Sequence, residues 1–333
     1  MTENGFPHAG DLEAAGIAQE ELHSRALAIT QSRFGYEIFV RAVLEVSNTC
    51  RENCHYCGMR RDNRELERYR VKFETLADLV LNHCPSIVTD INLQSGEDPV
   101  AVREVVIPLV KLLRRETALG VSVCVGTLSP ALTEEIRAAG AGMYIIKFEM
   151  ADPSLYKELR APGTFEERIA HIRRLAAEGW NVSSGFIAGL PGQDNESFIQ
   201  NFHLASQLPL RGCSVSPFVP GESTPLANAR GGKVDLTLNC MAALRLMRPD
   251  WVVPAVSALN IAGGEDGYRR GLRAGANLCT INLTPDAHRG KYLLYKKDRF
   301  VMSTQRVSEA LEQEGLVPSS VSIADYFEVA QPR

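Results

Sequence analysis

Short apolar segments rich in β-branched residues alternate with longer amphipathic segments, and this alternation constrains the fold more than any other feature. The eight short runs read RAVLEV, SIVTDINLQSG, GVSVCVGTL, GMYIIKFEM, NVSSGFIAGLPG, GCSVSPFVP, WVVPAVSAL and GANLCTINL. Segments between them, such as VREVVIPLVKLLRRET and FEERIAHIRRLAAEG, space their apolar residues as helices do. Strands that alternate with helices predict parallel βαβ units, and eight such units can close into a barrel. We therefore predict an α/β fold of the (βα)8 TIM-barrel type.

The rest of the chain predicts no separate domain. Residues 11–34 have helical spacing, and no linker rich in Pro or Gly is long enough to divide the sequence. We expect an N-terminal helical extension over 1–36, the barrel over 37–315 and a C-terminal tail over 316–333.

Composition excludes several classes of partner. The 333 residues are 45% hydrophobic and carry a net charge of −4, so no overall positive field favours nucleic acid or a membrane surface. No stretch approaches the roughly 20 apolar residues of a membrane span, and the N-terminus lacks the pattern of a signal peptide. Eight cysteines without an export signal do not suggest a disulfide framework. We expect a cytoplasmic protein with no nucleic-acid or membrane partner.

Unusual residues follow the predicted strands at the ends where barrel enzymes carry their active sites. Three cysteines follow the first run, SGEDP ends the second, KFE ends the fourth and GLPGQ follows the fifth. We expect these segments to meet at one face of the barrel.

The three cysteines are Cys50, Cys54 and Cys57, in the segment SNTCRENCHYC. A structural zinc site usually has four protein ligands, and a disulfide would leave one thiol over. An iron–sulfur cube with three thiolate ligands fits best, because it leaves one iron open for another ligand. Zinc and unligated surface cysteines remain as alternatives.

The motif C-x-x-x-C-x-x-C, with Tyr56 before its last cysteine and Gly58 after it, resembles the radical S-adenosylmethionine (SAM) superfamily. The resemblance implies a [4Fe–4S] cluster whose open iron binds SAM and reductively cleaves it to a 5′-deoxyadenosyl radical. The radical would act on a small substrate in the barrel lumen. A reductase such as a flavodoxin or ferredoxin would supply the electron.

Further segments resemble one subgroup of this superfamily, which contains biotin synthase, methylornithine synthase and the maturase of [FeFe]-hydrogenase. The resemblance rests on SNTCRENCHYCGMRRDNRELERYR, LQSGEDP, GFIAGLPGQ and SPFVPGESTPLAN, and is strongest to the maturases, the HydE-like proteins. It implies a SAM site in which the turn Ser95-Gly96-Glu97 holds the methionyl ammonium. It also implies that Arg168 binds the SAM carboxylate, that Glu149 binds the ribose, and that adenine contacts Ile187 and the backbone of Tyr56.

The substrate is less constrained. By alignment, serines replace two cysteines that hold the second cluster of biotin synthase, and Val256 and Ala258 replace polar residues of methylornithine synthase. If the runs are strands, four small polar residues are expected to line the lumen and contact substrate: Ser216, Ser257, Thr280 and Asn282. Cys124 is interpreted as a buried free cysteine. A carbon-skeleton mutase, sulfur insertion of the lipoyl or biotin type, and a non-catalytic iron–sulfur scaffold remain alternatives.

Overall fold

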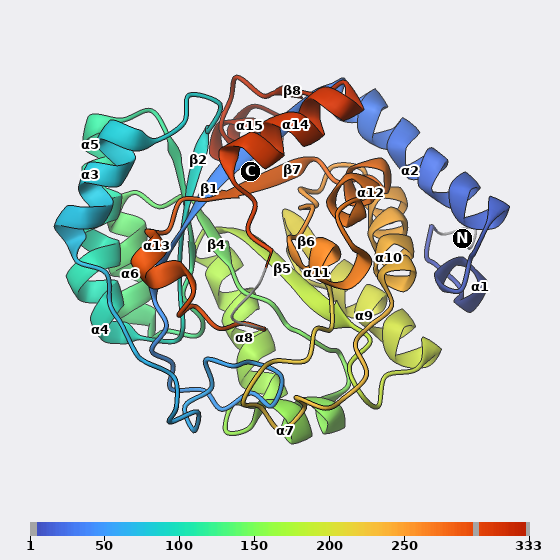
Figure 1. Cartoon of the computed structure of the whole chain (residues 1–333), viewed down its shortest axis with the longest axis horizontal. Coiled ribbons are helices and arrows are strands. Elements are labelled where there is room, and N and C mark those ends of the chain that lie inside the picture. The colour runs from blue at the N-terminus through green and yellow to red at the C-terminus, as the bar shows by residue number, and fades with distance from the viewer. Residues whose placement is uncertain (1–4, 296–299, 331–333) are drawn as a thin grey trace.

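A ring of parallel strands forms the centre of the molecule (Figure 1). The computed structural model describes residues 5–295 and 300–330. The strands pair in the order β6-β5-β4-β3-β2-β1-β7, and every pairing along this path is parallel. Their bounds are β1 Glu37–Ser47, β2 Asp90–Ser95, β3 Gly120–Cys124, β4 Met143–Ile145, β5 Asn181–Ala188, β6 Gly212–Pro217 and β7 Leu278–Asn282. The predicted α/β barrel fold is confirmed.

One predicted strand, the run WVVPAVSAL at 251–259, does not form a regular strand. It makes single parallel bridges to both neighbours, Val252 to Gly212 of β6 and Pro254 to Leu278 of β7. Pro254 has no N–H group to donate, which interrupts a regular ladder. The segment nevertheless closes the ring between β6 and β7. A two-residue strand, β8 Val317–Pro318, pairs with the start of β1 outside the ring.

Helices surround the ring, and some of them begin with a capping side chain. Ser129 accepts a hydrogen bond at the start of α6, and Thr164 with Glu167 forms a capping box on α8. The helices before β5 are α1 Ala9–Leu12, α2 Ile17–Phe34, α3 Phe73–His83, α4 Pro99–Ala101, the π-helical turn η1 Val102–Val106, α5 Ile107–Glu116, α6 Pro130–Ala139, α7 Pro153–Arg160 and α8 Phe165–Ala177. Those after β5 are α9 Asn195–Gln207, α10 Val234–Met247, α11 Ala258–Gly263, α12 Gly267–Arg273, α13 Asp286–Arg289, α14 Thr304–Glu314 and α15 Ile323–Ala330.

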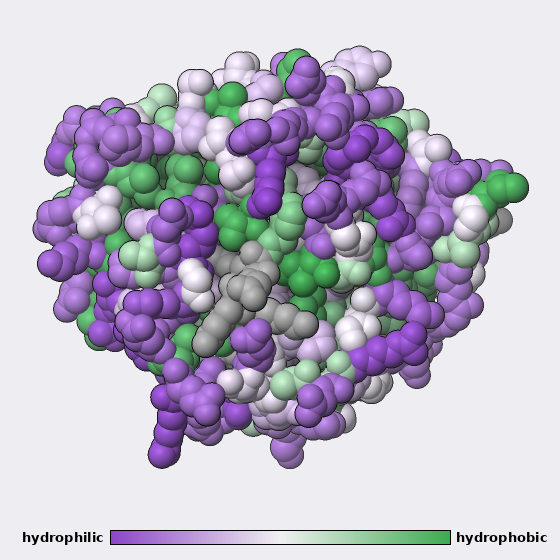
Figure 2. All heavy atoms as spheres, in the orientation of Figure 1, coloured by the Kyte–Doolittle hydropathy of each residue, from purple (hydrophilic) through white to green (hydrophobic). Residues whose placement is uncertain are grey.

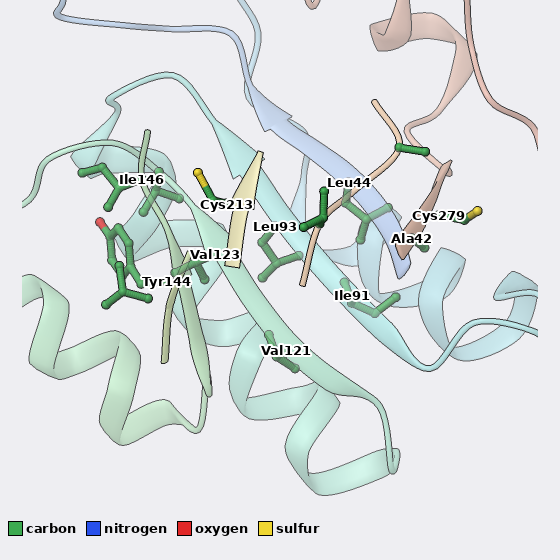
Figure 3. Packing of buried hydrophobic residues seen from close by; sticks show 14 of the residues in the cluster. Ala42, Leu44, Ile91, Leu93, Val121, Val123, Tyr144, Ile146, Cys213 and Cys279 are labelled. Carbon is green, nitrogen blue, oxygen red and sulfur yellow. The ribbon is translucent and has the colours of Figure 1, made fainter. Parts of the chain in front are cut away.

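Side chains alternate along the strands between the helices and the lumen. In β1, Ala42 and Leu44 belong to the hydrophobic core, together with Ile91 and Leu93 of β2 (Figure 3). The intervening residues of these strands line the lumen, and several of them are polar or charged. The core therefore lies between strands and helices and leaves a polar interior in the barrel.

Helix α15 covers the end of the barrel at which the strands begin. Ile323 and Phe327 pack against Phe39 of β1, Met143 of β4 and Leu278 of β7. The lumen is therefore closed by apolar packing at this end. Among the described residues, none of the helices combines the length and the apolar character that crossing a membrane requires. The division of the chain at residues 36 and 315 stays a prediction.

Candidate active site

The predicted site residues come together in space. All of them line one cavity of about 350 Å³. In the face shown in Figure 2, hydrophobic residues gather near the middle, and hydrophilic residues dominate the periphery. The lining residues predicted from sequence are Cys50, Cys54, Tyr56, Cys57, Ser95, Gly96, Glu97, Glu149, Arg168, Ile187, Ser216, Ser257, Thr280 and Asn282.

The cysteine loop follows β1 and is held by side chains that bond its backbone. Arg68 donates to Asn48 O at 2.7 Å and to Met59 O at 2.9 Å, and Asn63 donates to Gly58 O at 2.7 Å. Such bonds replace the missing ladder of a strand or helix. They fix the loop that carries the three thiols before any ligand binds.

The three thiols lie in a dry environment. Burial raises the pKa of Cys50 to about 11 and also raises the pKa values of Cys57 and Cys54, with the Arg160 cation opposing the shift at Cys54. Arg160 Nη1 donates to Cys54 Sγ at 2.8 Å, and Glu97 N donates to Cys50 Sγ at 3.4 Å. Thiols in such a place gain most from a metal that binds their deprotonated form.

The arrangement of the thiols suits a cluster of several irons. Within residues 5–295 and 300–330, no group of three His, Cys, Asp or Glu side chains is placed to hold a metal ion. In a cube each thiolate binds a different iron, so the three sulfur atoms need only face one shared volume. Cys50, Cys54 and Cys57 do so, because all three line the same cavity.

The turn after β2 touches the cysteine loop. A Cβ atom at Gly96 would lie 2.3 Å from Thr49 O and 2.8 Å from Cys50 Cβ, so only glycine fits. The Gly96 N–H donates to Ser47 O at 3.1 Å. This close approach places Ser95 and Glu97 beside the thiols.

Glu97 is buried among arginines, with 6% of its surface exposed. Its carboxylate lies 3.1 Å from Arg168 Nη2, 3.3 Å from Arg51 Nε and 3.6 Å from Arg160 Nη2. Arg168 is also buried, at 6% exposure, although it lies on the helix α8. The two residues that the resemblance assigns to the ammonium and the carboxylate of SAM therefore form an ion pair with each other here.

Glu149 has a strained backbone. Its φ is +68°, a left-handed conformation that costs a residue with a Cβ atom roughly 1–2 kcal/mol. Two hydrogen bonds to β5 hold it, from Glu149 N to Gly185 O at 3.0 Å and from Ile187 N to Glu149 O at 2.9 Å. This conformation places its side chain at the cavity, with Oε2 lying 3.3 Å from Lys147 Nζ.

An apolar cluster lies beside Glu149. Tyr56 and Ile187 pack there with Met150, Leu155 and Phe218. Tyr56 Oη is buried and finds no hydrogen-bond partner in the described part of the chain. The cluster offers a flat apolar surface of the kind that receives an aromatic base.

The four predicted substrate residues line the lumen, and two of them bond to charged residues that sequence reasoning missed. Arg41 Nε donates to Thr280 Oγ1 at 3.1 Å, and Asn282 Nδ2 donates to Glu45 Oε1 at 3.1 Å. Arg41 and Glu45 alternate along β1 with residues of the core. This alternation with a period of two is visible in the run RAVLEV and could have identified both residues as facing the lumen.

The segment after β4 contributes a second cation to the lumen, Lys147. Lys147 Nζ donates to Ser216 Oγ at 3.4 Å. Cys124 lies nearby; it is a free cysteine, as expected, but it is half-buried and lines the cavity. The burial of Cys124 raises the pKa of its thiol to about 11, although the Arg41 and Lys147 cations oppose the shift.

Comparisons with known proteins identify related sequences and structures. A sequence profile described as the Radical SAM superfamily matches residues 44–205. The chain is 34% identical over 278 residues to the protein named [FeFe] hydrogenase maturase subunit HydE of Thermotoga maritima, covering 83% of this chain and 79% of that protein. It is 29% identical over 289 residues to the 3-methylornithine synthase of Methanosarcina barkeri, covering 84% and 79%. The crystal structure of methylornithine synthase (PylB) matches with a TM-score of 0.84 at 27% identity, covering 96% of this chain and 94% of that one.

These similarities extend over most of both chains and include the cysteine loop and the barrel. They support the HydE-like subgroup that the sequence motifs indicated. The chain therefore belongs to the radical SAM superfamily, whose enzymes use a [4Fe–4S] cluster and S-adenosylmethionine.

Proposed function

We propose that Cys50, Cys54 and Cys57 hold the cluster and that the enzyme uses SAM to act on a small molecule in the lumen. When bound, the reduced cluster supplies one electron that splits SAM into methionine and a 5′-deoxyadenosyl radical. The observation that carries the proposal is the single cavity that joins the three thiols, the SGE turn and the polar lumen. A barrel interior keeps water away from reactive species.

The ion pair of Glu97 and Arg168 explains how the chain would bind the methionyl group. That group carries one ammonium and one carboxylate. It can therefore replace the internal ion pair with two new ones, in which Glu97 and Arg168 each face a group of opposite charge. Glu97 would accept from the ammonium, and Arg168 would donate its two-pronged guanidinium to the carboxylate. The buried pair thus keeps both charges compensated until SAM binds.

The remaining parts of SAM have matching surfaces. The Glu149 carboxylate at the cavity can accept hydrogen bonds from the two ribose hydroxyls, as acidic residues do in other nucleotide sites. Adenine would lie against the apolar cluster around Ile187 and Tyr56.

The two cations of the lumen can bind an anionic group of the substrate. Arg41 of β1 and Lys147, which follows β4, line it, while Ser216, Ser257 and Thr280 supply small hydroxyls. We propose a HydE-like substrate, a metal complex or amino-acid derivative with a carboxylate, supported by the 34% identity to the maturase. A maturase of [FeFe]-hydrogenase is the first candidate, with a flavodoxin or ferredoxin as electron donor.

A methylornithine-synthase-like mutase is the second candidate. Arg41 and Glu45 both line the lumen, and charges of both signs favour it, because a zwitterionic amino acid needs both. Sulfur insertion is less supported, since Ser122 and Ser183 stand where biotin synthase has cysteine ligands, and a hydroxyl is a poor ligand for iron–sulfur centres.

Deuterium transfer distinguishes the two candidates. The iron-loaded enzyme is incubated anaerobically with dithionite, SAM and either a cysteine-bound iron carbonyl–cyanide complex or a deuterated diamino acid. Faster 5′-deoxyadenosine formation with the iron complex alone supports the maturase. Deuterium in 5′-deoxyadenosine from the amino acid supports the mutase. A rate unaffected by either substrate would contradict both.

A further inference from the structure

Arg160 ends helix α7 and lies directly beneath the cysteine loop. The helix begins at Pro153 under the cap of Asp152 and packs its buried face, including Tyr156 and Leu159, into the apolar cluster of the site. Its last turn meets the loop, because His55 N donates to Leu159 O at 2.8 Å. The position of Arg160 is therefore set by rigid elements on both sides.

Three contacts fix the guanidinium of Arg160. Nη1 donates to Cys54 Sγ at 2.8 Å, and Nε donates to Tyr156 Oη at 3.2 Å. Nη2 lies 3.6 Å from Glu97 Oε1. Only 8% of the side chain is exposed, so little solvent screens these charges.

None of the functions assigned to the cavity so far uses this arginine. The SAM carboxylate is assigned to Arg168 and the ribose to Glu149, so no part of SAM is assigned to Arg160. Its closest polar contact is the sulfur of an expected cluster ligand. Hydrogen bonds to ligand sulfurs, net charge and solvent exposure set the reduction potentials of iron–sulfur clusters.

We propose that Arg160 is a positioning residue that raises the reduction potential of the cluster through its hydrogen bond to Cys54 Sγ. Reduction adds one negative charge, part of which resides on the ligand sulfurs. A fixed, desolvated cation beside one sulfur stabilises the reduced form more than the oxidised form. This inference rests on the cluster assigned under the proposed function.

The test is a redox titration of the reconstituted enzyme without SAM, followed by the electron paramagnetic resonance signal of the reduced cluster. Arg160→Met is expected to lower the midpoint potential by at least about 59 mV, for transfer of one electron. At a fixed applied potential, the ratio of reduced to oxidised cluster should then decrease at least tenfold. Arg160→Lys keeps the charge but loses the planar fork, so its midpoint should fall between the two.

Lys157→Met is the matched control, since it removes an exposed cation from the same helix. Its midpoint should equal that of the wild type. Iron and sulfide content are measured for each variant, and Arg160→Gln replaces Arg160→Met if the latter holds less iron. An Arg160→Met variant with the wild-type midpoint potential would overturn the inference. If that variant loses iron, wild-type midpoint potentials in both Arg160→Gln and Arg160→Lys would overturn it.

The two proposals fail in different ways. If the wild-type protein takes up no cluster, or cleaves no SAM, the proposed function is wrong. If it does both and the potential does not depend on Arg160, only the present inference is wrong.

Discussion

Cys54 is the most buried of the three expected cluster ligands and the one that Arg160 contacts. Cys54→Ser replaces a soft thiolate with a hydroxyl that binds iron weakly, so we expect loss of most of the cluster. Iron and sulfide content after anaerobic reconstitution measure the result. Cys84→Ser is the control, because Cys84 is a half-buried free cysteine that lies outside the cavity. Equal iron content in the two variants would show that Cys54 is not a ligand.

The left-handed backbone of Glu149 is expected to lower the stability of the folded protein. Glu149→Asn should raise the free energy of unfolding by about 1 kcal/mol relative to Glu149→Gln, because asparagine tolerates the left-handed conformation and glutamine does not. Both variants lose the carboxylate, so both should bind SAM at least tenfold more weakly, about 1.4 kcal/mol. Urea unfolding and equilibrium binding of SAM measure the two effects. Tight SAM binding by either variant would contradict the ribose assignment.

At the scale of residues, motif reasoning placed every predicted site residue at the cavity but missed the charges around them. Cysteine spacing and the SGE turn are local signals, so a sequence carries them directly. Arg160 is different: it meets Cys54 only because α7 ends under the cysteine loop, which is a tertiary contact between residues far apart in sequence. Nothing in ELRAPG indicates that contact.

At the scale of elements, the junction of β2 and α15 has a pH-dependent stability. The Asp90 carboxylate accepts from Ile323 N at 3.1 Å at the start of α15. Burial raises the pKa of Asp90 to about 6, above its ordinary value of 3.8, despite this hydrogen bond. Between pH 4 and pH 6 the folded state therefore binds more protons than the unfolded state, and the contribution of Asp90 to stability decreases as pH rises.

Asp90→Asn removes this dependence while keeping an oxygen that can accept from Ile323 N. Relative to the wild type, the variant should gain stability as pH rises from 4 to 6, by up to about 3 kcal/mol for a shift of roughly two pKa units. Urea unfolding at pH 4, 5, 6 and 8 measures the difference. A difference that is constant over this range would show that Asp90 is ionised in the same way in both states.

Strands were predictable where a β-branched apolar run could donate and accept the hydrogen bonds of a regular ladder. The runs at 41–46 and 181–192 both contain regular strands, whereas the run at 251–259 looks equally β-like but forms only bridges, because Pro254 interrupts its donors. The short strand β8 has no apolar run of its own. Its pairing with β1 depends on how the C-terminal tail folds back, and no local sequence pattern predicts that.

At the scale of the whole molecule, the barrel separates two chemical environments. Apolar packing of α15 closes the end where the strands begin, and the cavity with its thiols lies at the other end. Between them the lumen carries Arg41, Glu45 and Lys147 rather than the layers of branched residues that fill many barrels. The molecule thus combines a lumen that carries charged side chains with the proposed cofactor site at its mouth.

The most direct test of this account is the amount of 5′-deoxyadenosine formed per cluster by the anaerobically reconstituted protein with dithionite and SAM. We predict formation that requires both the reductant and SAM and that is absent in Cys54→Ser. A fully loaded, reducible wild-type cluster that yields no 5′-deoxyadenosine would indicate an iron–sulfur scaffold. Undiminished product from Cys54→Ser would contradict the assigned cluster site.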